Sequence, residues 1–185
     1  MKKFDIKNLS LKGAKIINRK KNSDSRGYFS RLFCFDELNE EDKFDTLKQI
    51  NISYTKTRNT IRGLHFQLPP YAEKKIITCV KGKIFDIIVD LRKGSPTFLN
   101  FHNEILSENN ETSLLVPEGF AHGFLSLDND CEVLYFHTKN YNPDYERGVR
   151  YDDPKLGINW PSKAFEISER DSNFPLLTEQ FDGLD

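Results

Sequence analysis

The sequence predicts a mainly β protein whose strands form either a sandwich or a barrel. In the middle of the chain, short runs rich in Val, Ile, Leu and Phe alternate with turns that contain glycine or proline. Short strands at such close spacing are typical of both architectures. The composition agrees, because 15 phenylalanines and a single methionine suit an aromatic-lined β core better than a helical bundle.

The first predicted element is a short surface helix over Asp36–Leu47, with Asp36 as its possible N-cap. Two β-branched runs follow, Lys74–Val80 and Lys83–Leu91, and the Lys81-Gly82 pair between them indicates a hairpin. A further strand is expected over Thr97–Leu106.

The second half of the chain continues this pattern. Thr112–Leu127 is interrupted by Pro117, Gly119 and Gly123, which predicts a strand, a turn and another strand. Cys131–Thr138 predicts one more strand, and the C-terminal segment 162–185 is expected to be helical only in part.

Length and charge limit the function classes. A chain of 185 residues without repeats or linkers is expected to form one domain, residues 1–185. The net charge of −1 argues against a nucleic-acid-binding protein, which would need a basic excess. There is no apolar run long enough to span a membrane and no signal-peptide pattern, so no membrane association is expected.

The cysteines and histidines predict neither a disulfide framework nor a metal site. Cys34, Cys79 and Cys131 are widely spaced, and free thiols suit a cytoplasmic location. No His-x-His pair is present, although small β-barrels commonly use one to hold a metal. The nucleotide-binding glycine motifs are absent as well, so no cofactor is expected.

The segment Ile61–Lys75 contains the first candidate functional residues. A lone histidine on a strand, as His65 is expected to be, is more often a hydrogen-bonded core residue than a catalyst. The functional interpretation gains from Arg62, three residues away, and from Lys75, which a hairpin would bring near His65. These residue types suit general acid–base chemistry with a cation that stabilises a negative oxygen.

Strand alternation relates further candidates to each other. Val133, Tyr135 and His137 are expected to share one face of their strand. Two of the four histidines, His102 and His137, lie in no motif and are interpreted as structural or surface residues.

Two more polar residues each have two interpretations. Asp86 interrupts an apolar strand, so it lies either on a solvated face or in the interior beside a partner. His122 lies in a glycine-containing turn, which suits either a functional position at a barrel mouth or a plain tight turn.

Eight segments, in chain order, resemble a known family. They are DSRGYF (Asp24–Phe29), QINIS (Gln49–Ser53), IRGLHFQ (Ile61–Gln67), KGKIFDIIVDLRKGSPTF (Lys81–Phe98), VPEGFAHGFLSL (Val116–Leu127), EVLY (Glu132–Tyr135), YDDPKLGINWP (Tyr151–Pro161) and RDSNFPLL (Arg170–Leu177). Together they are similar to the dTDP-4-dehydrorhamnose 3,5-epimerase family over nearly the whole chain. This resemblance implies a cupin-type double-stranded β-helix (jelly-roll) barrel with a few short peripheral helices. It also implies a homodimer that uses no metal or cofactor and acts on a nucleotide-linked 4-keto-6-deoxy sugar.

The resemblance implies roles for individual residues. His65 would be the catalytic base, and Asp171 would orient it. Lys75 would stabilise the enolate oxygen, while Tyr135 would be the acid on the opposite face of the sugar. The implied substrate-binding residues are Arg26, Gln49, Asn51, Arg62, Asp86, His122 and Tyr141, some of them acting across the dimer interface.

The implied chemistry suits these residue types. A C4 ketone makes the protons on C3 and C5 removable, because one enolate oxygen carries the charge in both cases. A neutral histidine is a weak base, so the oxygen needs a fixed cation. Inversion also needs a second acid that returns the proton on the other face.

Four positions depart from the family pattern: Arg31 (Glu in the family), Leu115 (Trp), Phe136 (Lys) and Asn140 (Tyr). The catalytic set is intact, so the sequence specifies the 4-keto-sugar chemistry more closely than it specifies thymidine. A GDP- or CDP-linked sugar, a longer sugar, and inversion at C3 or C5 alone stay open. So do a 3,4-ketoisomerase and a non-enzymatic cupin that binds sugar or metal.

Overall fold

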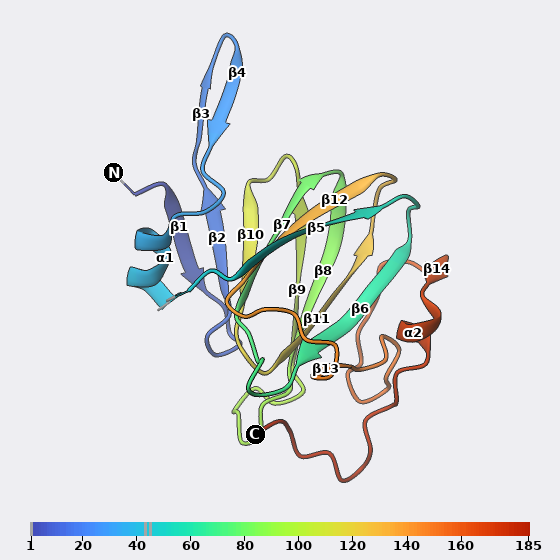
Figure 1. Ribbon diagram of the computed structural model, residues 1–185. Helices are drawn as coiled ribbons and strands as arrows, with labels where there is room; N and C mark the ends of the chain where they lie inside the picture. The colour runs from blue at the N-terminus through green and yellow to red at the C-terminus, as the bar shows by residue number, and fades with distance from the viewer. Residues whose placement is uncertain (1, 43, 45) are drawn as a thin grey trace.

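The structure is a computed structural model that describes residues 2–42, 44 and 46–185. Two β-sheets face each other and form a jelly-roll barrel, as the sequence predicts (Figure 1). All the strand pairs in the two sheets are antiparallel except the short pair β14–β6.

The first sheet has the strand order β1-β2-β10-β7-β12-β5. Its strands are Phe4–Asn8 (β1), Lys15–Arg19 (β2), Thr112–Val116 (β10), Lys75–Lys81 (β7), Cys131–His137 (β12) and Gln49–Thr55 (β5). Strand β5 therefore forms one edge of this sheet.

The second sheet has the strand order β13-β6-β11-β8-β9, with β14 paired to β6. Its strands are Glu146–Gly148 (β13), Thr60–Gln67 (β6), Phe120–Ser126 (β11), Lys83–Asp90 (β8), Phe101–Ser107 (β9) and Glu166–Ile167 (β14). A separate hairpin of Lys21–Asp24 (β3) and Gly27–Ser30 (β4) projects away from the barrel (Figure 1).

Strand alternation divides the core into three layers. Side chains such as Ile77, Ile88 and Val133 fill the space between the two sheets. The outer face of the first sheet carries a second cluster, which includes Phe136 and Leu38 of helix α1 (Phe35–Asp42). The C-terminal segment covers the outer face of the second sheet with a third cluster.

The predicted strands are confirmed, but the predicted hairpin at Lys81-Gly82 is wrong. Strands β7 and β8 belong to different sheets, and only Gly82 separates them. A two-residue turn needs two residues between its strands, so this link bends the chain from one sheet into the other instead. The same correction applies to the hairpin expected between the strands of His65 and Lys75, because β6 and β7 also lie in different sheets.

Smaller differences concern the ends of elements. Helix α1 begins at Phe35, so Asp36 lies in its first turn and is not the N-cap. The described helix ends at Asp42, and residues 43 and 45 of the predicted helix lie outside the described residues. Strand β9 begins at Phe101 because residues 97–100 form a turn, and Gly123 lies inside β11 without breaking it.

The C-terminal segment contains one short helix, α2 (Glu169–Ser172), as the partly helical expectation allows. Cys34, Cys79 and Cys131 are free thiols. Within the described residues, no helix combines the length and apolar character that crossing a membrane would require.

Candidate active site

A cavity of about 890 Å³ opens between the two sheets at one end of the barrel. Both sheets and the segment around α2 contribute to its wall. Eight of the residues predicted from the sequence line it: Asn51, Arg62, His65, Lys75, His122, Tyr135, Tyr141 and Asp171. The four residues predicted to be catalytic therefore share one cavity, together with four of those predicted to bind the substrate.

His65, on β6, is hydrogen-bonded to Asp171 of α2. Its Nε2 lies 2.8 Å from Asp171 Oδ1, while Asp171 Oδ2 accepts a hydrogen bond of 3.0 Å from the Gly63 N–H. Burial alone would raise the pKa of Asp171, but the bonds from His65 and Gly63 and the charge of Arg170 lower it to about 2. Because an ionised carboxylate only accepts, Nε2 donates the proton and Nδ1 is the ring nitrogen left to act as a base.

Arg170 lies beside this pair. Its Nε donates to Asp171 Oδ1 at 3.1 Å, and its Nη2 is 3.0 Å from His65 Nε2. Arg170 Nη2 is a donor, and so is His65 Nε2 when it carries a proton, so these two nitrogens cannot form a hydrogen bond with each other in that state. While His65 donates to Asp171, the hydrogen bond that Arg170 keeps is the one from its Nε to Asp171 Oδ1.

Lys75, at the start of β7, faces the cavity with only 6% of its surface exposed. Its Nζ lies 3.5 Å from Oε1 of Glu73. The other oxygen of Glu73, Oε2, lies 3.0 Å from Nδ1 of His137 on β12. Burial alone would raise the pKa of Glu73, but the His137 hydrogen bond and the Lys75 charge bring it below its ordinary value.

Tyr135 enters the cavity from β12, on the sheet that faces β6. Its hydroxyl is 3.0 Å from Oγ of Ser53 on β5. Burial raises the pKa of the Tyr135 phenol well above its ordinary value, even though the Ser53 hydrogen bond opposes this. The phenol therefore stays protonated at neutral pH and can donate a proton.

Asp86 and His122 form a buried pair behind the cavity. His122 Nε2 is 2.8 Å from Asp86 Oδ2, and the two residues are 5% and 0% exposed. Burial raises the pKa of Asp86 and lowers that of His122, because it disfavours both charged forms. The structure thus places Asp86 in the interior with a partner and His122 on a strand that lines the cavity.

The predicted substrate-binding residues differ in position. Arg62 donates from Nε to Thr55 Oγ1 and from Nη2 to the Tyr54 carbonyl, both at 2.9 Å, and it lines the cavity. Gln49 does not line the cavity directly, but it donates to Asn51 and accepts from the backbone of Tyr141, each at 3.0 Å.

Arg26 is not part of this cavity in its own chain. It lies in the turn of the β3–β4 hairpin and pairs with Asp24 at 2.6 Å. The hairpin points away from the barrel, so Arg26 is far from the other predicted residues (Figure 1).

Sequence reasoning missed Glu73 and His137, both of which line the cavity. His137, interpreted from the sequence as a structural or surface residue, contributes to the cavity wall and contacts Glu73. Its position two residues after Tyr135 was the available signal, because alternation places both side chains on the same face. Glu73 precedes its strand, where no periodicity indicates the direction of a side chain.

Three of the four departures from the family pattern lie away from the cavity. Arg31 pairs with Glu37 of α1 at 2.6 Å. Leu115 and Phe136 belong to the outer cluster of the first sheet. Asn140 lies closer, and its carbonyl accepts a bond of 3.4 Å from Gln67.

Across residues 2–42, 44 and 46–185, no group of three or more His, Cys, Asp or Glu side chains is arranged to hold a metal ion.

Comparison with known proteins gives consistent results. The family model for dTDP-4-dehydrorhamnose 3,5-epimerase matches residues 8–179. A dTDP-4-dehydrorhamnose 3,5-epimerase of Sinorhizobium fredii is 41% identical over 175 residues, which cover 94% of this chain and 90% of the relative.

Two solved structures are informative. One is a dTDP-4-dehydrorhamnose 3,5-epimerase of Bacillus anthracis with TDP and PPi bound; its TM-score is 0.89 at 38% identity, covering 94% of this chain and 99% of that one. The other is a 3′-monoepimerase of Streptomyces bikiniensis in complex with dTDP-quinovose. It has a TM-score of 0.84 at 32% identity, covering 91% of this chain and 85% of that one.

Proposed function

The chain belongs to the dTDP-4-dehydrorhamnose 3,5-epimerase family, and from this premise we propose that it inverts C3 and C5 of a dTDP-linked 4-keto-6-deoxy sugar. One observation carries the proposal. His65 and Tyr135 extend from facing sheets into the same cavity, and Lys75 lines that cavity too. Proton removal from one face of a sugar ring and proton return on the other face require this kind of arrangement.

His65 removes the proton beside the C4 carbonyl. Asp171 holds Nε2–H, so Nδ1 accepts the proton and the carboxylate stabilises the imidazolium that forms. Because the pKa of Asp171 is about 2, this support is present throughout the neutral range.

Lys75 stabilises the enolate oxygen. Removing the C3 proton or the C5 proton places the negative charge on the same C4 oxygen, so one fixed cation serves both steps. Lys75 is buried and sheltered from water. Its interaction with a developing negative charge is therefore stronger than it would be at the surface.

Tyr135 returns the proton on the opposite face. A phenol with a raised pKa keeps its proton until an enolate carbon is placed beside it. Ser53 holds the hydroxyl in position at 3.0 Å.

The remaining cavity residues bind the substrate. Arg62 supplies a fixed guanidinium for the diphosphate, and Asn51 and Tyr141 supply polar contacts nearby. The TDP and PPi in the Bacillus anthracis relative support a dTDP-linked substrate.

We also propose that the protein acts as a homodimer in which Arg26 serves the partner's cavity. The β3–β4 hairpin exposes Tyr28 at 62% and Phe29 at 70%, which is costly for an isolated chain. The edge strand β5 exposes Ile50 and Ile52 as well. These apolar surfaces suit contact with a second copy of the chain.

Solvent deuterium exchange tests the function. The protein is incubated in heavy water with dTDP-, GDP- and CDP-linked 4-keto-6-deoxy sugars, and NMR follows C3, C5 and the carbonyl carbon. We expect exchange and inversion at both carbons of the dTDP sugar. Absence of exchange with all three substrates would falsify the proposal, and a displaced carbonyl would identify a ketoisomerase instead.

A second candidate is inversion at C3 alone. The similarity to the 3′-monoepimerase of Streptomyces bikiniensis favours it. The same experiment separates the two, since a monoepimerase would leave the configuration of C5 unchanged.

A further inference from the structure

We propose that Glu73 and His137 form a positioning pair for Lys75, in which Glu73 keeps the ammonium charged and directed into the cavity while His137 holds Glu73 in place. This inference rests on the proposed function, because it assigns a role beside the same reacting carbonyl. Neither residue was assigned a catalytic or substrate-binding role from the sequence.

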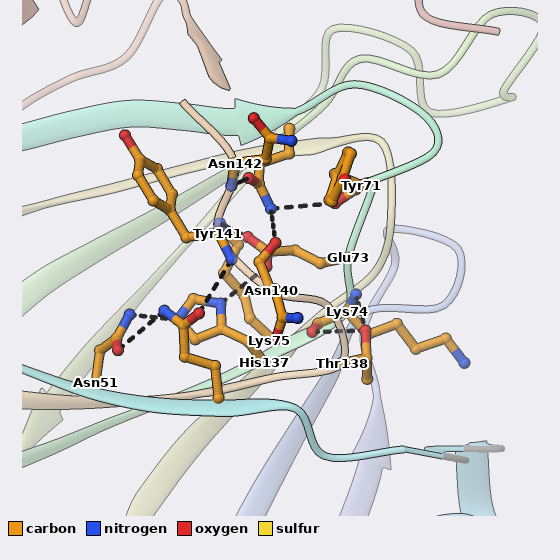
Figure 2. Close-up of polar contacts among 12 residues, drawn as sticks. Asn51, Tyr71, Glu73, Lys74, Lys75, His137, Thr138, Asn140, Tyr141 and Asn142 are labelled. Atoms are coloured by element: carbon orange, nitrogen blue, oxygen red, sulfur yellow. Dashed lines mark hydrogen bonds and ion pairs between the residues drawn. The ribbon is translucent and has the colours of Figure 1, made fainter. Parts of the chain in front are cut away.

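The two partners of Glu73 use different oxygens of its carboxylate. Oε1 lies 3.5 Å from Lys75 Nζ, and Oε2 lies 3.0 Å from His137 Nδ1 (Figure 2). The Glu73 carboxylate therefore links a strand-β7 residue to a strand-β12 residue, and its orientation is fixed at both ends.

The backbone register builds this arrangement. His137 on β12 is directly opposite Lys75 on β7, so the two side chains leave the same face of the sheet as neighbours. Just before β7, the Lys74 N–H donates to Thr138 Oγ1 at 2.9 Å, and the Thr138 N–H donates to the Lys74 carbonyl at 3.1 Å. These bonds hold the chain directly after Glu73 against the end of β12 (Figure 2).

Charge explains why Lys75 needs such a partner. Burial favours the neutral amine over the ammonium, unless a negative charge lies close by. The other carboxylates in or beside the cavity wall have partners of their own. Asp171 is bonded to His65 and Asp86 to His122, while Glu146 pairs with Arg170 and Glu166 accepts from the Thr60 hydroxyl. Among the described residues, Glu73 is the one in ion-pair contact with Lys75.

The distances leave Lys75 available for the substrate. A separation of 3.5 Å is an ion pair but exceeds a good charge-assisted hydrogen bond. The ammonium can therefore keep its N–H groups for a carbonyl oxygen.

His137 also touches the residue proposed as the acid. Its ring lies against that of Tyr135, with centroids 6.1 Å apart and planes 22° apart. Its Nε2 is 3.5 Å from Asn51 Nδ2. The Glu73–His137 pair thus contacts Lys75 on one side and Tyr135 on the other.

Other charged or titratable groups lie in or beside the same cavity as Lys75 and would remain in a Glu73 variant. They are Arg62 and His65 on β6, Asp86 on β8, His122 on β11, and Tyr135 and His137 on β12. Asp86 is fully buried, and burial raises its pKa, so it is a weak substitute for Glu73 as a counter-ion.

The test compares Glu73→Gln, Glu73→Asp and a control, Glu104→Gln. Glu104 pairs with His102 at 3.4 Å in the same kind of contact but lies outside the cavity wall. We expect the alkaline decline of kcat to begin at lower pH in Glu73→Gln than in the wild type, with kcat about tenfold below the wild-type value on the alkaline side. KM should stay within about twofold, Glu73→Asp should be intermediate, and Glu104→Gln should match the wild type.

Two variants of His137 keep the test valid if Glu73→Gln does not fold. His137→Asn places an amide N–H near the position of Nδ1 and should retain the wild-type pH profile. His137→Leu removes that donor and should shift the profile in the direction of Glu73→Gln.

The outcomes are distinct. A wild-type protein that exchanges no substrate deuterium overturns the proposed function, and the positioning role with it. An active wild type beside a Glu73→Gln variant with an unchanged pH profile overturns the positioning role alone. The same holds if Glu73→Gln loses an equal factor at every pH, or if His137→Asn and His137→Leu behave alike, because each indicates a purely structural pair.

Discussion

Three histidines hold carboxylates around one cavity, and their environments differ. His65 and His137 hold ionised partners, because hydrogen bonds and nearby cations lower the pKa values of Asp171 and Glu73. His122 holds Asp86 in a fully buried site, where burial raises the pKa of the acid and lowers that of the base. One residue pairing thus gives two kinds of site: pairs with a nearby Lys or Arg, in which the carboxylate keeps its negative charge, and a fully buried pair that disfavours charge.

The proposed acid and base should fail in different ways when they are removed. His65→Ala should abolish deuterium exchange at both C3 and C5, a loss of about 100- to 10,000-fold, because proton removal starts each inversion. Tyr135→Phe should reduce inversion more than exchange, since the proton still leaves but does not return on the far face. NMR of the substrate in heavy water measures both, and an equal loss in the two assays for Tyr135→Phe would contradict the assigned roles.

Asp171 should make folding stability depend on acid pH. Its folded pKa of about 2 lies below the ordinary value of 3.8, so its ionised form is stabilised by folding. That contribution, about 2 kcal/mol, is complete above about pH 5 and is lost as pH falls toward 2. Asp171→Asn should therefore unfold more easily at neutral pH, and the difference should shrink on acidification.

Urea unfolding of both proteins from about pH 7 down to about pH 3 measures this convergence. Two parallel stability curves would show that the folded-state contacts of the ionised Asp171 carboxylate do not stabilise the fold.

The sequence predicts which residues belong to the site where those residues lie in a strand or in a recognisable segment. Tyr135, His122 and Arg62 are found that way and line the cavity. Glu73 was not, because its direction is set by contacts with β12, a strand more than 50 residues further along the chain. A local pattern cannot report a contact of that kind.

At the scale of elements, the sequence predicts where strands lie but not which strands pair. Alternation and turn residues are local, and they locate β7, β8, β10, β11 and β12 to within a few residues. Pairing depends on the two-sheet topology, in which most consecutive strands from β5 to β13 lie in opposite sheets, the exception being the pair β8–β9. That topology places β6 and β7 in opposite sheets, so His65 and Lys75 reach the cavity from opposite sides instead of sharing a hairpin.

The close approach of β6 and β11 should be sensitive to a single methyl group. A Cβ on Gly123 would lie 2.7 Å from the Arg62 carbonyl oxygen and 2.8 Å from Leu64 Cδ2. Gly123→Ala should therefore push β6 away, destabilise the protein by about 1–3 kcal/mol and lower kcat, because β6 carries both Arg62 and His65.

Gly157→Ala is the control. Its φ of +59° strains any side chain, but nothing lies within 4 Å of the added atom. It should cost about 1 kcal/mol of stability without loss of kcat. Equal effects of the two substitutions on kcat would rule out crowding between β6 and β11 as the cause.

At the scale of the whole molecule, the cavity of one chain lacks Arg26, one of the predicted substrate-binding residues. Arg26 lies at the tip of a hairpin that extends away from the barrel, and aromatic side chains on that hairpin are exposed. A hairpin of this shape gains packing when it covers a second copy of the chain. In a two-fold symmetric dimer, each chain then completes the cavity of the other.

Mixing two inactive variants tests this exchange directly. Arg26→Ala should weaken substrate binding in every cavity of its own dimer, and His65→Ala removes the proposed base. In a hybrid dimer, the cavity with an intact His65 receives the intact Arg26 of its partner, so one of the two sites works. Random mixing makes half of the dimers hybrid, and activity should return to about a quarter of the wild-type value.

A mixture of His65→Ala with Lys75→Met is the control: both changes lie in the same cavity, so each hybrid site keeps one of them and stays inactive. If Arg26 instead serves its own chain, the first mixture will stay as inactive as the control.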